Sequence, residues 1–244
     1  MNWINGRNAI ARAIRLDLTH PQVYYGRALQ RYVTPGIRWL DVGCGYQILP
    51  EWALAEDAQR ELVASVASLT GIDVDPRIAE HPLLTYRVSA LGGALPFRDQ
   101  SFDLITANMV IEHIRQPEKF LADMYRVLRS GGRLLFHTPN FLFWMTFVSY
   151  FTPDAIKKPI VWRLERRHAD DVFPTHYTLN TPWRIERLAR AAGFQVEELM
   201  MAGSNRIFER LGPVGWVDAV LTKGMSTVAR GRLQSNIIAV LRRQ

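Results

Sequence analysis

The stretch Trp39–Gly45 (Trp-Leu-Asp-Val-Gly-Cys-Gly) constrains the fold of this chain more than any other. An apolar strand runs directly into Gly43 and Gly45, and glycines permit backbone angles closed to other residues and let the main chain approach a ligand. Asp41, near the carboxyl end of the strand, needs a hydrogen-bonding partner if it is buried, either a ligand or the backbone of the next loop. A plainer interpretation is a tight strand-to-helix turn capped by Asp41. Both interpretations predict the first strand of an α/β sheet.

Strands and helices alternate along the chain up to Asn140. Helical periodicity or helix-end signals cover residues 7–33, the region from the glycines to about residue 69, and residues 117–128 and 182–192. Short apolar segments predict strands at residues 37–42, 69–74, 83–89, 102–107, 133–138, 195–201 and 236–241. This order predicts an α/β fold with a doubly wound, mostly parallel, Rossmann-like sheet of about seven strands and helices on both faces.

The alternation of strands and helices is interrupted between residues 141 and 180, a segment rich in aromatic and basic side chains. We therefore predict a single domain over residues 1–244 with four parts. These are an N-terminal helical segment (1–36), a cofactor-binding core (37–140), a cap insertion after the fifth strand (141–180) and a completion of the sheet (181–244).

Composition indicates an ordinary globular protein, since 48% of the residues are hydrophobic and 22% are charged. The most apolar stretch, Phe141–Phe151, is too short to cross a bilayer, and Met1–Arg7 lacks the order of a secretory signal. The single cysteine, Cys44, excludes an internal disulfide, and no Cys/His cluster has zinc spacing. We therefore expect a cytoplasmic protein without a metal site.

The net charge of +7 is concentrated in the second part of the chain. Residues 1–140 carry 15 basic and 14 acidic side chains, whereas residues 141–244 carry 15 basic and 9 acidic ones. This excess fits either a solvated arginine-rich surface or a region that meets a substrate or partner.

A second acidic residue, Asp73, ends the next predicted strand. Ligands of open α/β sheets bind at the carboxyl ends of the strands, where a carboxylate can accept two hydrogen bonds from a ribose diol. The nearby Asp75 precedes a proline and fits a turn or cap. A nicotinamide dinucleotide site is disfavoured, because Ile48 stands where the fingerprint needs glycine or alanine and Asp73 lies 28 residues past Gly45 rather than about 20. No Gly-Lys-Ser/Thr follows the glycines, which excludes a P-loop.

Taken in order, five motifs resemble those of the class I S-adenosylmethionine-dependent methyltransferases, in the small-molecule branch that includes quinone-biosynthesis enzymes. They are Leu40-Asp-Val-Gly-Cys-Gly45, Gly71-Ile-Asp73, Leu95-Pro-Phe-Arg-Asp-Gln-Ser-Phe-Asp-Leu104, Glu112-His113 and Arg126-Val-Leu-Arg-Ser-Gly-Gly132. The resemblance covers residues 37–140 and extends more weakly to the last strands.

The resemblance implies S-adenosyl-L-methionine as the cofactor. The glycines would line its methionine end, Asp73 would hold the ribose hydroxyls, and Asn108 and Met109 would border the reactive sulfonium. The full set of predicted cofactor contacts is Asp41, Gly43, Cys44, Gly45, Asp73, Val74, Leu91, Asn108 and Met109. This chain departs from the family pattern twice: Tyr46-Gln47 follows the glycines where a small residue and glycine are common, and Leu91 stands where many members carry an acidic residue near the adenine.

Methyl transfer from a sulfonium needs mainly an acceptor held in line, and a base only for a weak nucleophile such as a hydroxyl. The candidate bases are His113, which follows the fourth predicted strand, and His176 in the cap. His113 could instead face a neighbouring helix, and His176 could belong to a charged surface loop. His137 alternates within a strand, which indicates a structural role.

The predicted acceptor is a small molecule, a lipid precursor or a saccharide. The basic second part keeps open an RNA or other nucleic-acid methyltransferase. The altered loop at Tyr46 keeps open a non-catalytic cofactor-binding module of the same fold. Nucleic acid is disfavoured because Asn108-Met-Val-Ile111 stands where base-amino methyltransferases place Asn/Asp-Pro-Pro-aromatic. Residues 141–151 could contact a membrane surface and an amphiphilic acceptor, but we favour a lid packed on the sheet.

Overall fold

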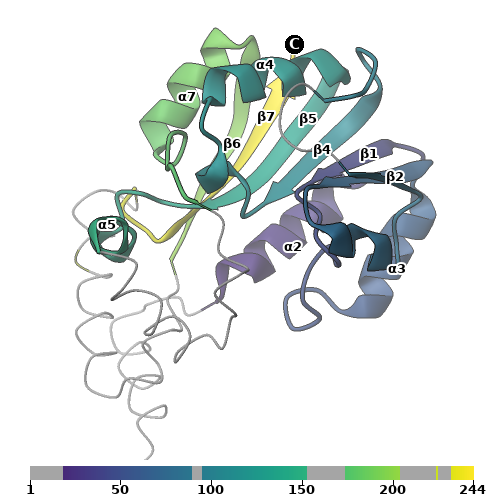
Figure 1. The fold of residues 1–244 in the computed structure, drawn as a ribbon, viewed down its shortest axis with the longest axis horizontal. Coiled ribbons are helices and arrows are strands. Elements are labelled where there is room, and N and C mark those ends of the chain that lie inside the picture. Colours follow the sequence, from purple (N-terminus) through teal and green to yellow (C-terminus); the bar gives the residue numbers. More distant parts are fainter. Residues whose placement is uncertain (1–18, 90–94, 153–173, 204–223, 225–231) are drawn as a thin grey trace, which may run out of the picture.

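The computed structural model describes residues 19–89, 95–152, 174–203, 224 and 232–244. Within them, seven strands form one sheet in the order β3-β2-β1-β4-β5-β7-β6 (Figure 1). The strands are β1 (Arg38–Val42), β2 (Ser68–Asp73), β3 (Tyr86–Ser89), β4 (Phe102–Asn108), β5 (Leu128–Pro139), β6 (Phe194–Ala202) and β7 (Asn236–Arg243). The pairs among β1 to β5 are parallel, and β7 runs antiparallel to both β5 and β6. The predicted fold class is thus confirmed.

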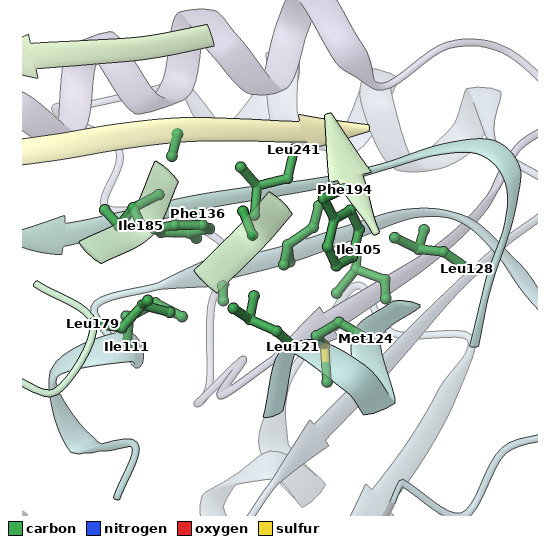
Figure 2. Close-up of a cluster of buried hydrophobic side chains, with 14 of the residues drawn as sticks. Ile105, Ile111, Leu121, Met124, Leu128, Phe136, Leu179, Ile185, Phe194 and Leu241 are labelled. Carbon is green, nitrogen blue, oxygen red and sulfur yellow. The ribbon is translucent and has the colours of Figure 1, made fainter. Parts of the chain in front are cut away.

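Helices cover both faces of this sheet. They are α2 (Pro21–Tyr32), α3 (Glu56–Ser65), α4 (Pro117–Val127), α5 (Trp144–Phe151) and α7 (Pro182–Ala191), with 3-10 turns η1 (Pro76–Glu80) and η2 (Ile111–His113). Adjacent strand residues alternate between two cores, so that Leu135 packs with α2 and α3 while Leu134 and Phe136 pack with α4 and α7. Figure 2 shows the core that packs with α4 and α7, in which Ile185 lies beside Phe136 and Leu121 beside Met124.

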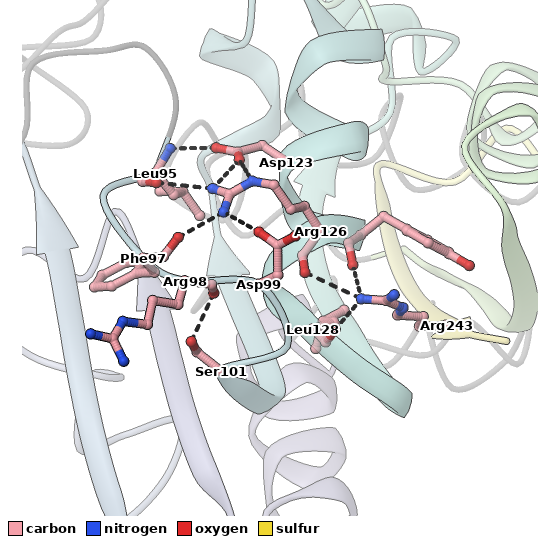
Figure 3. Close-up of polar contacts among 10 residues, drawn as sticks. Leu95, Phe97, Arg98, Asp99, Ser101, Asp123, Arg126, Leu128 and Arg243 are labelled. Atoms are coloured by element: carbon pink, nitrogen blue, oxygen red, sulfur yellow. Dashed lines mark hydrogen bonds and ion pairs between the residues drawn. The ribbon is translucent and has the colours of Figure 1, made fainter.

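Two arginines fix neighbouring parts of the fold: Arg126 holds the loop before β4, and Arg243 holds the carboxyl end of α4 (Figure 3). The Arg126 guanidinium donates to the carbonyl oxygens of Leu95 at 2.9 Å and Phe97 at 2.7 Å, and it pairs with Asp123. Arg243, at the end of β7, donates to carbonyl oxygens at the carboxyl end of α4, including that of Tyr125 at 2.7 Å. The Arg243 bonds satisfy carbonyl oxygens at the end of α4 that have no partner within the helix.

The segment between the glycines and α3 differs from the prediction, because helix begins only at Glu56. The buried Gln59 side chain explains the difference. Its amide nitrogen donates to the carbonyl oxygens of Leu49 at 2.9 Å and Leu54 at 2.7 Å, and its oxygen accepts the Leu49 N–H at 3.2 Å. These bonds hold residues 49–54 in turns that a helix would replace.

The fifth strand also begins earlier than predicted, at Leu128 instead of residue 133. Leu128 pairs with Phe102, and the register between β4 and β5 then shifts before Leu104. The Ser130-Gly-Gly132 segment therefore lies within this extended stretch, directly after α4 has ended at Val127. In the part of the chain that the structure describes, no helix is both long and apolar enough to cross a membrane.

Candidate functional site

Three polar residues lie at or next to the carboxyl ends of neighbouring parallel strands. Asp41 lies one residue before the end of β1, Asp73 ends β2 and Asn108 ends β4. The chain order reverses between β1 and β4, since β2 and β3 extend the sheet on one side and β4 and β5 on the other. Ligands of open α/β sheets bind at such a switch point.

The two glycines after β1 have different reasons for being glycine. Both have positive φ angles, +67° at Gly43 and +56° at Gly45. A Cβ atom on Gly43 would lie 2.3 Å from Cγ2 of Val110, whereas one on Gly45 would meet no atom within 4 Å. Gly43 thus lets the loop pack against the loop after β4, and Gly45 leaves its backbone open to the close approach of a ligand.

Asp73 joins the glycine loop to the end of β2. One carboxylate oxygen accepts the Gly45 N–H at 2.7 Å and the other accepts the Asp75 N–H at 2.8 Å. Each oxygen has a second lone pair, so the carboxylate can still accept hydrogen bonds from a vicinal diol. Val74 follows with an exposed side chain, and Asp75 caps η1 by accepting the Arg77 N–H, the turn-and-cap role expected of it.

Asp41 is buried and has a hydrogen-bonding partner on the neighbouring strand β4. The Thr106 hydroxyl of β4 donates to its carboxylate at 2.5 Å. Burial raises the pKa of Asp41 to about 7, the Thr106 bond lowers it and the nearby Asp73 charge raises it. Asp41 therefore titrates near neutral pH beneath the glycine loop.

Cys44 lies between the two glycines and is buried, and burial raises the pKa of its thiol well above the usual range. Its sulfur packs so close to Gly71 that a Cβ there would lie 2.7 Å away. The Cys44 thiol is thus a packing group.

The turn after β4 is held by β5 and by α2. Met109 has a φ of +59°, and its N–H donates to the His137 carbonyl at 2.8 Å. The Asn108 amide lies 2.9 Å from Nδ1 of His137 and donates to the Gln22 side chain at 3.1 Å. Burial lowers the pKa of His137 to about 4, so the ring is neutral and positions Asn108. Gln22 lies 86 positions from Asn108, and no sequence signal indicated it.

Farther along the same edge, Glu112 is a buried carboxyl that sequence reasoning assigned no role. The Thr138 hydroxyl donates to Glu112 at 3.0 Å, and the Asn180 amide donates to Thr138 at 2.6 Å. Burial raises the pKa of Glu112 to about 7. The Glu112 carbonyl accepts the N–H groups of His176 at 2.7 Å and Tyr177 at 3.2 Å. Residues 174–180, which belong to the predicted cap, are thereby fixed to η2 and to the end of β5.

The two candidate bases lie on either side of this contact. Nδ1 of His113 lies 2.9 Å from the Pro174 carbonyl oxygen and donates to it. His176 has an exposed side chain, and its backbone is tied to Glu112. The structure therefore brings His113 and His176 to the same end of the sheet.

An aromatic cluster of the described cap residues lies beside Glu112. The rings of Phe141, Tyr150 and Tyr177, the aromatic triad, have centroids 5.3 to 5.8 Å apart. Tyr177 has a φ of +51°, a conformation that bulky residues rarely adopt. Residues with such backbone conformations are common at functional sites. The triad thus forms an apolar wall near the candidate bases.

Some predictions fall outside the described residues: Leu91, and residues 153–173 of the cap. Among the residues that the structure does describe, no group of three His, Cys, Asp or Glu side chains is placed to hold a metal ion.

Comparisons with known proteins give one consistent result. A family model described as a methyltransferase domain matches residues 15–199. The chain is 34% identical over 114 residues to the mitochondrial ubiquinone biosynthesis O-methyltransferase of Rattus norvegicus, which covers 43% of this chain and 31% of that protein. It is 31% identical over 139 residues to the demethylmenaquinone methyltransferase of Tropheryma whipplei (strain Twist), covering 51% of this chain and 54% of that protein. The match thus spans about half or less of these curated relatives.

Among solved structures, the chain resembles an S-adenosylmethionine-dependent methyltransferase from Mesorhizobium loti with a TM-score of 0.55. The two are 19% identical, and the alignment covers 89% of this chain and 95% of that one. At this identity the likeness concerns the fold, and it agrees with the sheet described above.

Proposed function

Because the chain belongs to the methyltransferase-domain family, we propose that it transfers the methyl group of S-adenosylmethionine to a small-molecule acceptor. The matched family agrees with the methyltransferase family that the sequence motifs predict, and those motifs imply S-adenosylmethionine as the cofactor. The observation that carries the proposal is the junction of Gly45, Asp73 and Asn108 at the switch point of the sheet. There, an open backbone, a carboxylate with spare lone pairs and a fixed amide lie side by side.

The residues present fit the cofactor. Gly45 offers a backbone with open space where a Cβ would stand, and Asp73 supplies the acceptor for a ribose diol. Met109 is 37% exposed in the turn beside Asn108 and would border the sulfonium. Bound S-adenosylmethionine supplies a methyl group on a sulfonium whose positive charge is lost on transfer, so the leaving group needs no acid. The protein's task is then to align the acceptor and exclude water.

For the acceptor we propose a small molecule with a planar ring. The relatives reported above are a ubiquinone biosynthesis O-methyltransferase and a demethylmenaquinone methyltransferase. In this chain, the aromatic triad provides a wall on which a planar ring can stack. If the acceptor atom is a hydroxyl oxygen, Nε2 of His113 or the ring of His176 would take its proton. The described cap residues then serve as a lid over an apolar or amphiphilic acceptor.

Isothermal titration tests the cofactor part of this proposal. We expect binding of S-adenosylmethionine and S-adenosylhomocysteine and none of NAD; binding of NAD alone would refute the proposal. Methyl transfer to a panel of quinols and catechols tests the acceptor part. His113→Gln and His176→Gln should lower turnover and leave cofactor affinity nearly intact, because neither ring lies at the glycine loop. Full turnover in both variants would remove them as bases.

A further inference from the structure

The loop after the glycines presents two exposed aromatic rings on a fixed backbone. Tyr46 is 50% exposed and Trp52 58% exposed. Between and beside them, Leu49 and Leu54 are buried and bonded to the Gln59 side chain from α3. The backbone is thus pinned on either side of Trp52 and three residues after Tyr46. An exposed ring on a pinned loop costs little further entropy when a ligand covers it.

The Tyr46 ring is also held by Arg77, which follows Asp73 in the chain. The Arg77 guanidinium lies over this ring, 5.7 Å from its centroid. Arg77 in turn is fixed by Asp75, with Nε at 2.9 Å and Nη2 at 2.6 Å from one carboxylate oxygen. An arginine over an aromatic ring restrains it through cation–π attraction.

The residues that carry these contacts are linked through the Asp73 carboxylate. Gly45, which donates to one Asp73 oxygen, directly precedes Tyr46. The Asp75 N–H donates to the other Asp73 oxygen, and the Asp75 carboxylate accepts hydrogen bonds from the Arg77 guanidinium. The Tyr46–Arg77 pair therefore bridges the glycine loop and the end of β2 across the position where a sugar diol would be held.

We propose that Tyr46, held by Arg77, forms a wall of the nucleoside subsite and covers the sugar and base of a bound S-adenosyl compound. This inference rests on the proposed function. Family members commonly carry a small residue after the glycines, so the ring adds a contact that such members lack. A stacked ring is also a recognition element that needs no charge, which suits a chain with Leu91 where many members have an acid.

The test is the affinity of purified variants for S-adenosylhomocysteine, adenosine and methionine, measured by isothermal titration. Tyr46→Ala should weaken S-adenosylhomocysteine and adenosine by about 5- to 100-fold, the usual range for a lost base–aromatic stack, and leave methionine within about twofold. Tyr46→Phe should keep most of the affinity because the ring remains. Tyr86→Ala is the matched control, since Tyr86 is 60% exposed at the amino end of β3, away from the carboxyl ends of the strands.

Arg77 is tested through a double-mutant cycle. Arg77→Gln should weaken adenosine a few-fold when Tyr46 is present and have little effect in the Tyr46→Ala background. Thermal unfolding of each variant checks the fold, and Tyr46→Gln gives a second ring-free variant at the same exposed position.

The outcomes separate this inference from the proposed function. If the unaltered protein binds neither sulfur nucleotide, the proposed function and the nucleoside wall both fail. If it binds them and Tyr46→Ala and Tyr46→Gln behave like Tyr86→Ala, only the wall is wrong. An equal loss for methionine and adenosine would also overturn it, because the ring would then support the whole loop instead of covering the nucleoside.

Discussion

Replacing Gly43 with alanine should destabilise the protein far more than the same change at Gly45. Both residues have φ angles in the left-handed region, +67° and +56°. They differ in their surroundings, because the new methyl group on residue 43 would lie 2.3 Å from Cγ2 of Val110 and the one on residue 45 would enter open space. The pair therefore separates a conformational cost from a packing cost within one loop.

The two costs have known sizes. A left-handed conformation costs an alanine about 1–2 kcal/mol relative to glycine, and this applies at both positions. Overpacking of a filled site adds about 1–3 kcal/mol, and this applies at Gly43 alone. We therefore expect losses in the free energy of unfolding of about 2–5 kcal/mol for Gly43→Ala and about 1–2 kcal/mol for Gly45→Ala.

Urea unfolding of the ligand-free protein measures both losses without any contribution from cofactor binding. A double-mutant cycle with Val110→Ala isolates the clash, because this change removes the Cγ2 atom. In the Val110→Ala background, Gly43→Ala should cost only about as much as Gly45→Ala. Equal losses for the two single glycine variants, or additive effects of Gly43→Ala and Val110→Ala, would refute the packing argument.

Three further predictions follow from the site and its supports. Asp73→Asn, which keeps the shape of the side chain, should weaken S-adenosylhomocysteine at least tenfold in a titration, since charge-assisted bonds to the ribose are lost. The folded pKa of Glu112, about 7, exceeds the ordinary value of 4.5, so its contribution to stability is present below pH 4.5 and lost as the pH rises through 7. Glu112→Gln should therefore gain about 1–3 kcal/mol relative to the unaltered protein between pH 5 and pH 8, measured by urea unfolding. Arg243→Leu should cost about 1–3 kcal/mol in the same assay, because carbonyl oxygens at the end of α4 lose their donor.

The sequence predicts the parts of this molecule that depend on local patterns. Each of the seven strands lies where an apolar segment predicts one, and the positive φ angles of Gly43 and Gly45 agree with the unusual backbone expected of them. The prediction fails where the local backbone structure depends on a side chain that is distant in the sequence. The turns between residues 49 and 54 depend on Gln59, and the early start of β5 depends on the pairing of Leu128 with Phe102. Periodicity within a window carries no information about such contacts.

The same distinction between local and long-range contacts applies to the candidate site. At the cofactor end, Asp73 bonds to Asp75 two positions away and, through the glycine loop, to Gly45, so a short motif after each strand specifies most of the geometry. At the end proposed to hold the acceptor, Glu112 is joined to Thr138, 26 positions away, and Thr138 is joined to Asn180, 42 positions away. Among the described residues, the hydrogen bonds that join Glu112, Thr138 and Asn180 do not include Asp73 or the glycine loop. On the proposed function, the cap can therefore change its acceptor contacts while the cofactor contacts keep their geometry. A motif can therefore identify the cofactor of such a chain, whereas its acceptor is decided by side chains that only the folded protein brings together.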